Sequence, residues 1–210
     1  NINQAVNDLE LLCTLNDLPY NLVSKTINNF AITNQYNSWK TWIESKKWDS
    51  VDRLQDFYNT IQVIPEHEFV KKMYLWKFLF QLIHITCLNE NLRPKVAKLV
   101  LTLQGITNAG KTSWINTLAD DIICDHVIAG QNFDLNKETD VKKIVEHVIV
   151  ELGEIGSTYR KSDIDTVKNF ISASEDLLNI KYIERIQKTR RTTVFIGTVN
   201  EFSFLQDSTG

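Results

Sequence analysis

The fold of this chain is decided by the stretch Gly105-Ile106-Thr107-Asn108-Ala109-Gly110-Lys111-Thr112, which matches the pattern G-x-x-x-x-G-K-[ST]. The apolar run before it, Leu99 to Leu103, predicts a buried strand, and Ser113 to Leu118 predicts the opening of a helix. A strand, a glycine-containing turn and a helix N-terminus together aim backbone N–H groups at one point, which suits the phosphates of a nucleotide. The stretch therefore predicts a phosphate-binding loop.

The polar groups of this loop have expected roles. Lys111 is expected to neutralise the β- and γ-phosphates, and the Thr112 hydroxyl to reach a magnesium ion. The residues expected to bind nucleotide are Gly105, Asn108, Ala109, Gly110, Lys111, Thr112 and Ser113. The alternative is an ordinary glycine-containing loop, which the strand before it and the helix after it argue against.

Two further apolar runs, His147 to Leu152 and Thr193 to Val199, predict strands. Helical segments are expected between the strands, over residues 111–119, 140–145 and 163–174. Buried strands that alternate with helices predict an α/β fold, with a parallel sheet that helices cover on both faces.

The first part of the chain has a different character. Residues 1–93 contain no glycine, and their apolar residues recur at helical intervals. One such series comprises Phe69, Met73, Trp76, Phe80 and Ile83. We therefore expect a mainly helical N-terminal region over residues 1–93 and an α/β core over residues 94–210.

Polar side chains follow the second and third strands where each strand ends. Glu151 closes the second strand, Glu154 comes three residues later, and Asn200 follows the third strand. Glu151 would hold magnesium together with Thr112, Glu154 would orient the attacking water, and Asn200 would bond the γ-phosphate or that water. The alternative is that they are ordinary surface residues at strand ends and turns.

A basic segment lies between the second and third strands. Over residues 181–191 five cations stand against one acid, Glu184, in a chain whose net charge is −3. The cations are Lys181, Arg185, Lys188, Arg190 and Arg191. Such a segment suits a nucleic-acid backbone, although charge runs are usually solvated loops, and the residues alone leave both interpretations open.

Taken together, these residues resemble the virulence-associated E family, which is encoded on phages and bacterial pathogenicity islands and is related to superfamily 3 replicative helicases. The resemblance covers roughly residues 36–210. It is carried by residues 39–43, 48–54, 151–155, 168–171, 176, 182, 190–191, 195–200 and 204–210.

The resemblance implies a P-loop ATPase core of the AAA+ or superfamily 3 helicase type, with ATP and Mg²⁺, in a ring that is most often a hexamer around single-stranded or forked DNA. It makes residues 105–112 the Walker A loop, Glu151 and Glu154 the Walker B acids, Asn200 the sensor, and the basic segment a DNA-contacting hairpin. The relatives' arginine finger lies beyond the position of Gly210. We therefore expect weak hydrolysis from these residues alone.

The leading hypothesis is an ATP-dependent DNA helicase or translocase that replicates a phage or mobile element in the cytoplasm of a bacterial host. No segment resembles a signal peptide or membrane span, and the scattered cysteines and histidines predict no metal cluster. The alternative is a module that senses nucleotide and docks a primase or initiator without unwinding activity. A small-molecule kinase would leave the helical region unexplained.

Overall fold

The computed structural model of the chain describes residues 2–19, 23, 25–27, 36–87, 99–119, 121, 123–153, 164–178 and 187–200. The chain divides into two compact units. The larger unit comprises Ser38–Asp176 and Thr189–Gly210, and the smaller comprises Asn1–Asn37 and Leu177–Lys188.

A parallel sheet forms the centre of the larger unit. Its strands are β1 (Val100–Gln104), β2 (Val127–Ile128), β3 (Ile149–Leu152) and β6 (Val194–Val199). They lie in the order β1-β6-β3-β2, and each neighbouring pair is parallel. The predicted α/β fold with a parallel sheet is confirmed, and so are its three predicted strands. The two-residue strand β2 was not predicted.

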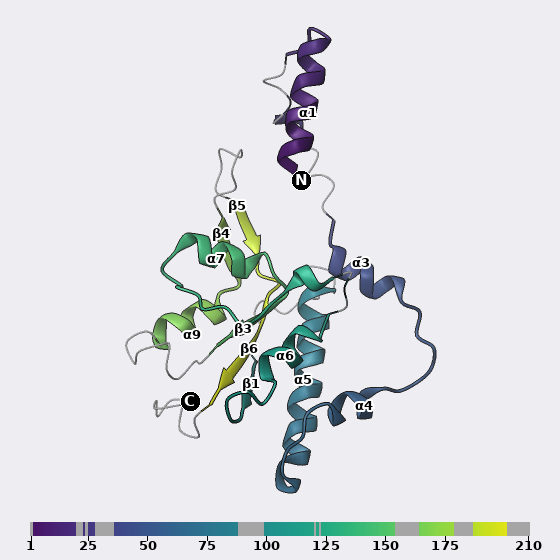
Figure 1. The fold of residues 1–210 in the computed structure, drawn as a ribbon, viewed down its shortest axis with the longest axis vertical. Coiled ribbons are helices and arrows are strands. Elements are labelled where there is room, and N and C mark those ends of the chain that lie inside the picture. The colour runs from purple at the N-terminus through teal and green to yellow at the C-terminus, as the bar shows by residue number, and fades with distance from the viewer. Residues whose placement is uncertain are drawn as a thin grey trace. The chain divides into compact units, whose positions relative to one another are not determined.

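Helices cover both faces of this sheet. Figure 1 shows α5 and α6 on one side of it and α7 and α9 on the other. The helices of the larger unit are α3 (Ser38–Ser45), α4 (Leu54–Asn59), α5 (Glu68–Thr86), α6 (Lys111–Asn116), α7 (Glu138–Val145) and α9 (Ile164–Ser172), with short 3₁₀ turns η2 (Pro65–His67) and η3 (Cys124–His126).

Successive residues of the strands supply two separate cores. Ile149 and Ile196 pack with Phe78 of α5 and Ile115 of α6 in one core. The other core contains Val150, Leu152 and Phe195, packed with Ile144 of α7 and Phe133. Because side chains alternate along a strand, a strand covered on both faces must be apolar throughout, which explains the unbroken apolar runs of the sequence.

The helix α5 is apolar on more than one side. The predicted helical series exists, but Phe69, Trp76 and Phe80 are 77%, 47% and 49% exposed. The face that packs on the sheet is instead formed by Leu75, Phe78, Leu82 and Ile85. Periodicity alone predicted the helix correctly but did not identify the face that the sheet covers.

The smaller unit contains the helix α1 (Ile2–Leu15). The strands β4 (Glu175–Leu178) and β5 (Gln187–Arg190) pair in a two-stranded sheet of their own. The helices α3, α4 and α5 belong to the same compact unit as the parallel sheet, and the division into two regions at residue 93 stays a prediction. None of the helices within the described ranges is long and apolar enough to cross a membrane.

Candidate nucleotide-binding site

The predicted phosphate-binding loop connects β1 to α6, which begins at Lys111. The Gly105 N–H donates to Val199 O at 3.2 Å, so the start of the loop is joined to the end of β6. The loop turns through two residues with positive φ, Asn108 at 63° and Gly110 at 81°. Asparagine and glycine are the residues that adopt this left-handed conformation most readily.

The turn gathers backbone donors at the start of α6. Its first helical hydrogen bond runs from Trp114 N–H to Gly110 O, at 2.8 Å. The N–H groups of residues 111–113 precede that bond and have no acceptor within the helix. Ile106, in the loop before them, is 74% exposed. An open helix N-terminus of this kind suits phosphate oxygens.

The ammonium of Lys111 lies at the centre of the loop. It donates to Gly105 O at 2.7 Å, to Ile106 O at 2.9 Å and to Asn200 Oδ1 at 2.8 Å. A lysine ammonium has three N–H donors, so oxygens of the chain account for all of them. The contact with Asn200 brings the loop lysine and the predicted sensor residue into one site.

The carboxylate of Glu151 is buried, with 2% of the residue exposed, and it accepts three hydrogen bonds. The Thr112 hydroxyl donates to Oε1 at 2.9 Å, the Thr198 hydroxyl to the same oxygen at 2.8 Å, and the Gly130 N–H to Oε2 at 2.7 Å. No ion pair among the described residues includes Glu151. The three hydrogen bonds therefore offset the free energy that burial of its charge costs.

These residues fit a nucleoside triphosphate and Mg²⁺. A hydroxyl and a carboxylate oxygen, 2.9 Å apart in Thr112 and Glu151, are the hard oxygen ligands that Mg²⁺ prefers. A buried carboxylate that lacks a cation among the described ion pairs is a suitable partner for such a metal. The Lys111 ammonium and the loop N–H groups fit the phosphates.

A model of the virulence-associated protein E-like domain matches residues 43–210 of the chain. The chain belongs to this family. The resemblance found in the sequence is thereby confirmed. Because this family is P-loop NTPase-like, membership implies that the chain binds a nucleoside triphosphate.

A solved structure agrees with this fold. The apo structure of the NrS-1 C-terminal region (305–718) matches 78% of the VapE-like chain with a TM-score of 0.50 and 18% sequence identity. At this identity the likeness is one of fold alone. The chain covers 38% of that solved region. No curated protein matches the chain.

The predicted site residues divide into three groups. In the VapE-like domain direct hydrogen bonds join Lys111 to Asn200 and Thr112 to Glu151. Glu154, Lys181 and Arg185 lie outside the described residues, and of Lys188 only the backbone, in β5, is described. Arg190 is half-buried at the end of β5.

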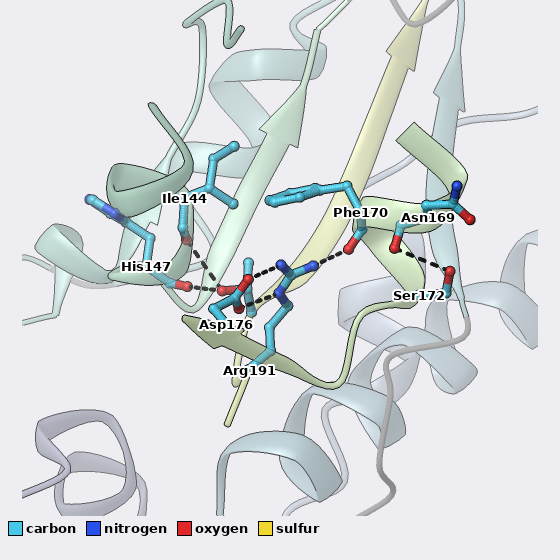
Figure 2. Close-up of polar contacts among 8 residues, drawn as sticks. Ile144, His147, Asn169, Phe170, Ser172, Asp176 and Arg191 are labelled. Carbon is cyan, nitrogen blue, oxygen red and sulfur yellow. Dashed lines mark hydrogen bonds and ion pairs between the residues drawn. The ribbon is translucent and has the colours of Figure 1, made fainter. Parts of the chain in front are cut away.

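Arg191 occupies a buried position instead of an open one. Its Nε donates to Asp176 Oδ2 at 2.7 Å, and its other nitrogens bond Asp176 Oδ1 and the Phe170 carbonyl. Figure 2 shows the guanidinium between Asp176 and Phe170, whose ring centroid lies 4.1 Å from Cζ. Because the guanidinium donors of Arg191 are bonded to these partners, we leave Arg191 out of the set of cations proposed to contact DNA.

Two residues at the site were not predicted from the sequence, Thr198 and Gly130. Thr198 was detectable as a hydroxyl near the end of an otherwise apolar strand. Gly130 follows a strand of only two residues, which gave no periodic signal. Trp114 of α6 is partly buried against the core that contains Phe78, and its indole N–H donates to Thr60 Oγ1 at 2.9 Å.

Proposed function

We propose that this chain is the ATP-hydrolysing core of a DNA helicase or translocase that serves the replication of a phage or another mobile genetic element. The observation that carries the proposal is the convergence of Lys111, Thr112, Glu151 and Asn200 at one edge of the sheet. A loop that only held phosphate would need neither a buried carboxylate nor an amide beside it. Their presence supports hydrolysis in addition to binding.

In the proposed reaction, water attacks the γ-phosphate of ATP in line with the departing ADP. Lys111 neutralises charge that develops on the phosphate oxygens in the transition state. Thr112 and Glu151 would hold Mg²⁺, which would offset the charge on the phosphate oxygens. Asn200 bonds the γ-phosphate or the attacking water, and Glu154 orients that water.

The basic segment supports DNA as the partner. Lys181, Arg185, Lys188 and Arg190 suit a phosphate backbone, since each neutralised phosphate releases counterions and adds salt-dependent affinity. The proposal includes a homo-oligomeric ring, a hexamer, in the full-length protein. In that arrangement several copies of the segment would surround single-stranded or forked DNA.

Replacement of Lys111 by Ala tests the proposal through ATP hydrolysis by the full-length protein, with and without single-stranded DNA. We expect the wild type to hydrolyse ATP faster with DNA, and K111A to lose turnover by at least about 10²-fold, the scale of losing one charge-stabilising group. K77A, which removes an exposed lysine from α5, is the matched control and should retain activity.

Undiminished hydrolysis in K111A would overturn the assignment of the site. Nucleotide binding by the wild type without any turnover, with DNA present, would favour the module that senses nucleotide and docks a primase or initiator. Displacement of a DNA strand by the full-length protein would separate a helicase from that module directly.

A further inference from the structure

Glu151 receives its three hydrogen bonds from three different elements. Thr112 belongs to α6, Gly130 follows β2, and Thr198 lies in β6. The hydroxyls of Thr112 and Thr198 share Oε1, at 2.9 and 2.8 Å, whereas the Gly130 N–H is bonded to Oε2 at 2.7 Å. Both oxygens therefore have a donor that does not come from the nucleotide loop.

The two donors outside the loop are held in place by the fold. Thr198 is 5% exposed and is paired in register with Leu103 of β1, so the sheet fixes its backbone. Gly130 has a φ of 72°, and a Cβ added there would lie 3.4 Å from the Thr112 methyl carbon. The positive φ and this close approach both favour glycine.

We propose that Thr198 and Gly130 are positioning residues that hold the two carboxylate oxygens of Glu151 in a fixed orientation while Thr112 turns to Mg²⁺. This inference rests on the proposed function. If the Thr112 hydroxyl leaves Oε1 for the metal, Glu151 still keeps one donor on each oxygen. The position vacated on Oε1 then faces the nucleotide loop, which is where a shared metal ligand is needed.

The decisive comparison is between T198V, which removes the hydroxyl at nearly constant volume, and T198S, which restores it. In the full-length protein we expect kcat for ATP hydrolysis to fall about 10- to 100-fold in T198V, the range for losing a hydrogen bond to a charged group. KM for ATP should change less than about twofold, because the phosphates keep Lys111 and the loop N–H groups. T198S should recover most of kcat.

Thr193, the residue directly before β6, supplies the matched control. Its hydroxyl is also buried, but it donates to carbonyls, to His147 O at 2.8 Å and to Ile144 O at 3.2 Å. T193V therefore loses comparable hydrogen bonds without touching Glu151. It should show any general loss of stability, measured by urea unfolding, while kcat stays near the wild-type value.

A binding measurement gives a second readout that does not depend on turnover. The affinity of a non-hydrolysable ATP analogue is measured by calorimetry with and without Mg²⁺. In T198V we expect the gain in affinity from Mg²⁺ to shrink, with affinity in its absence unchanged. G130A should behave in the same way, since its Cβ would disturb both the N–H donor and Thr112.

The outcomes separate the two claims. If the wild type binds ATP but does not hydrolyse it, the proposed function fails, and the positioning role is then decided by the Mg²⁺-dependent affinities of the wild type and T198V. If the wild type hydrolyses ATP and T198V matches it, only the positioning role is overturned. A T198S variant as impaired as T198V would also overturn it, because the hydroxyl would then not be the cause.

Discussion

At the scale of single residues, His126 joins α3 to the rest of the larger unit. Its Nε2 lies 2.6 Å from the hydroxyl oxygen of Ser38, the first residue of α3, and its ring meets the edge of Trp39 at 5.9 Å between centroids. Burial lowers the pKa of His126 below its ordinary value; the nearby charge of His147 adds to this effect, and Asp125 opposes it. The folded protein thus favours the neutral imidazole.

We predict that acid weakens the fold through this residue. Because the folded-state pKa of His126 lies below the value of about 6.5 in an unfolded chain, the unfolded state binds the proton first as pH falls. The stabilising contribution is complete above about pH 6.5 and is lost as pH falls from there through the folded-state pKa. Urea unfolding between about pH 7.5 and 5 measures this loss.

Substitution H126Q should flatten that dependence, whereas H67Q, at an exposed position in η2, should leave it as in the wild type. An equally steep loss of unfolding free energy in H126Q would contradict the assignment to His126.

Residues at strand ends were predictable where their type is unusual for their place. Glu151 and Asn200 stand out because a charged or amide side chain borders an apolar run, whereas Lys111 was predicted from the pattern G-x-x-x-x-G-K-[ST]. Of the donors on Glu151, Thr112 was predicted to lie beside it, whereas Gly130 acts through its backbone N–H and left no signal, and Thr198 left only a weak one because threonine is common in strands. Such contacts depend on register, which the sequence of one strand does not specify.

At the scale of elements, the ion pair of Arg191 and Asp176 joins the chain segments on either side of the basic residues. Asp176 lies in β4, Arg191 directly follows β5, and the Arg191 N–H also donates to Ser174 O at 3.1 Å. The side chains are 4% and 9% exposed, so water screens the pair little. The pair holds together the two ends of the segment proposed to contact DNA.

We predict that R191M destabilises the larger unit by about 3–5 kcal/mol, because it leaves the Asp176 carboxylate buried without its partner. Urea unfolding measures the change. The control R53M breaks a comparable bidentate pair with Asp49 that is exposed to solvent, where its effect should be small. Equal losses in the two variants would contradict the importance of burial for the Arg191 pair.

Among the elements, those with an apolar face were predicted from the residues themselves, whereas a hairpin at the basic segment was implied only by the family resemblance. The runs of β1, β3 and β6 are apolar because both faces are covered. The strand β2 has two residues, and β4 and β5 border a highly charged segment, so neither length nor periodicity indicated them. For α5 the helix was predicted but its buried face was not, because apolar residues occur on more than one side of it.

At the scale of the whole molecule, the proposed ring can be tested by mass. A single copy offers DNA one short basic segment on a chain of net charge −3. A ring would present several copies to one strand, and linked sites bind far more tightly than separate ones. Mass measurement of the full-length protein, alone and with an ATP analogue and single-stranded DNA, should therefore show assembly when both ligands are present.

The variant K111A, in which nucleotide binding is impaired, should assemble less on addition of the analogue. A strict monomer under all of these conditions would remove the ring from the proposal while leaving ATP hydrolysis open to its own test.

The family and the fold class were predictable from the sequence. The composition of the compact units was not, because it depends on which helices cover the sheet, and residue spacing does not determine that.

The three hydrogen bonds of the Lys111 ammonium have a consequence for nucleotide binding. A phosphate that enters the loop has to compete with oxygens that the chain already provides, so the affinity for nucleotide is a difference between two sets of contacts. The one side-chain oxygen in that set belongs to Asn200. The amide oxygen of Asn200 is therefore one of the groups with which a bound γ-phosphate would compete for the lysine.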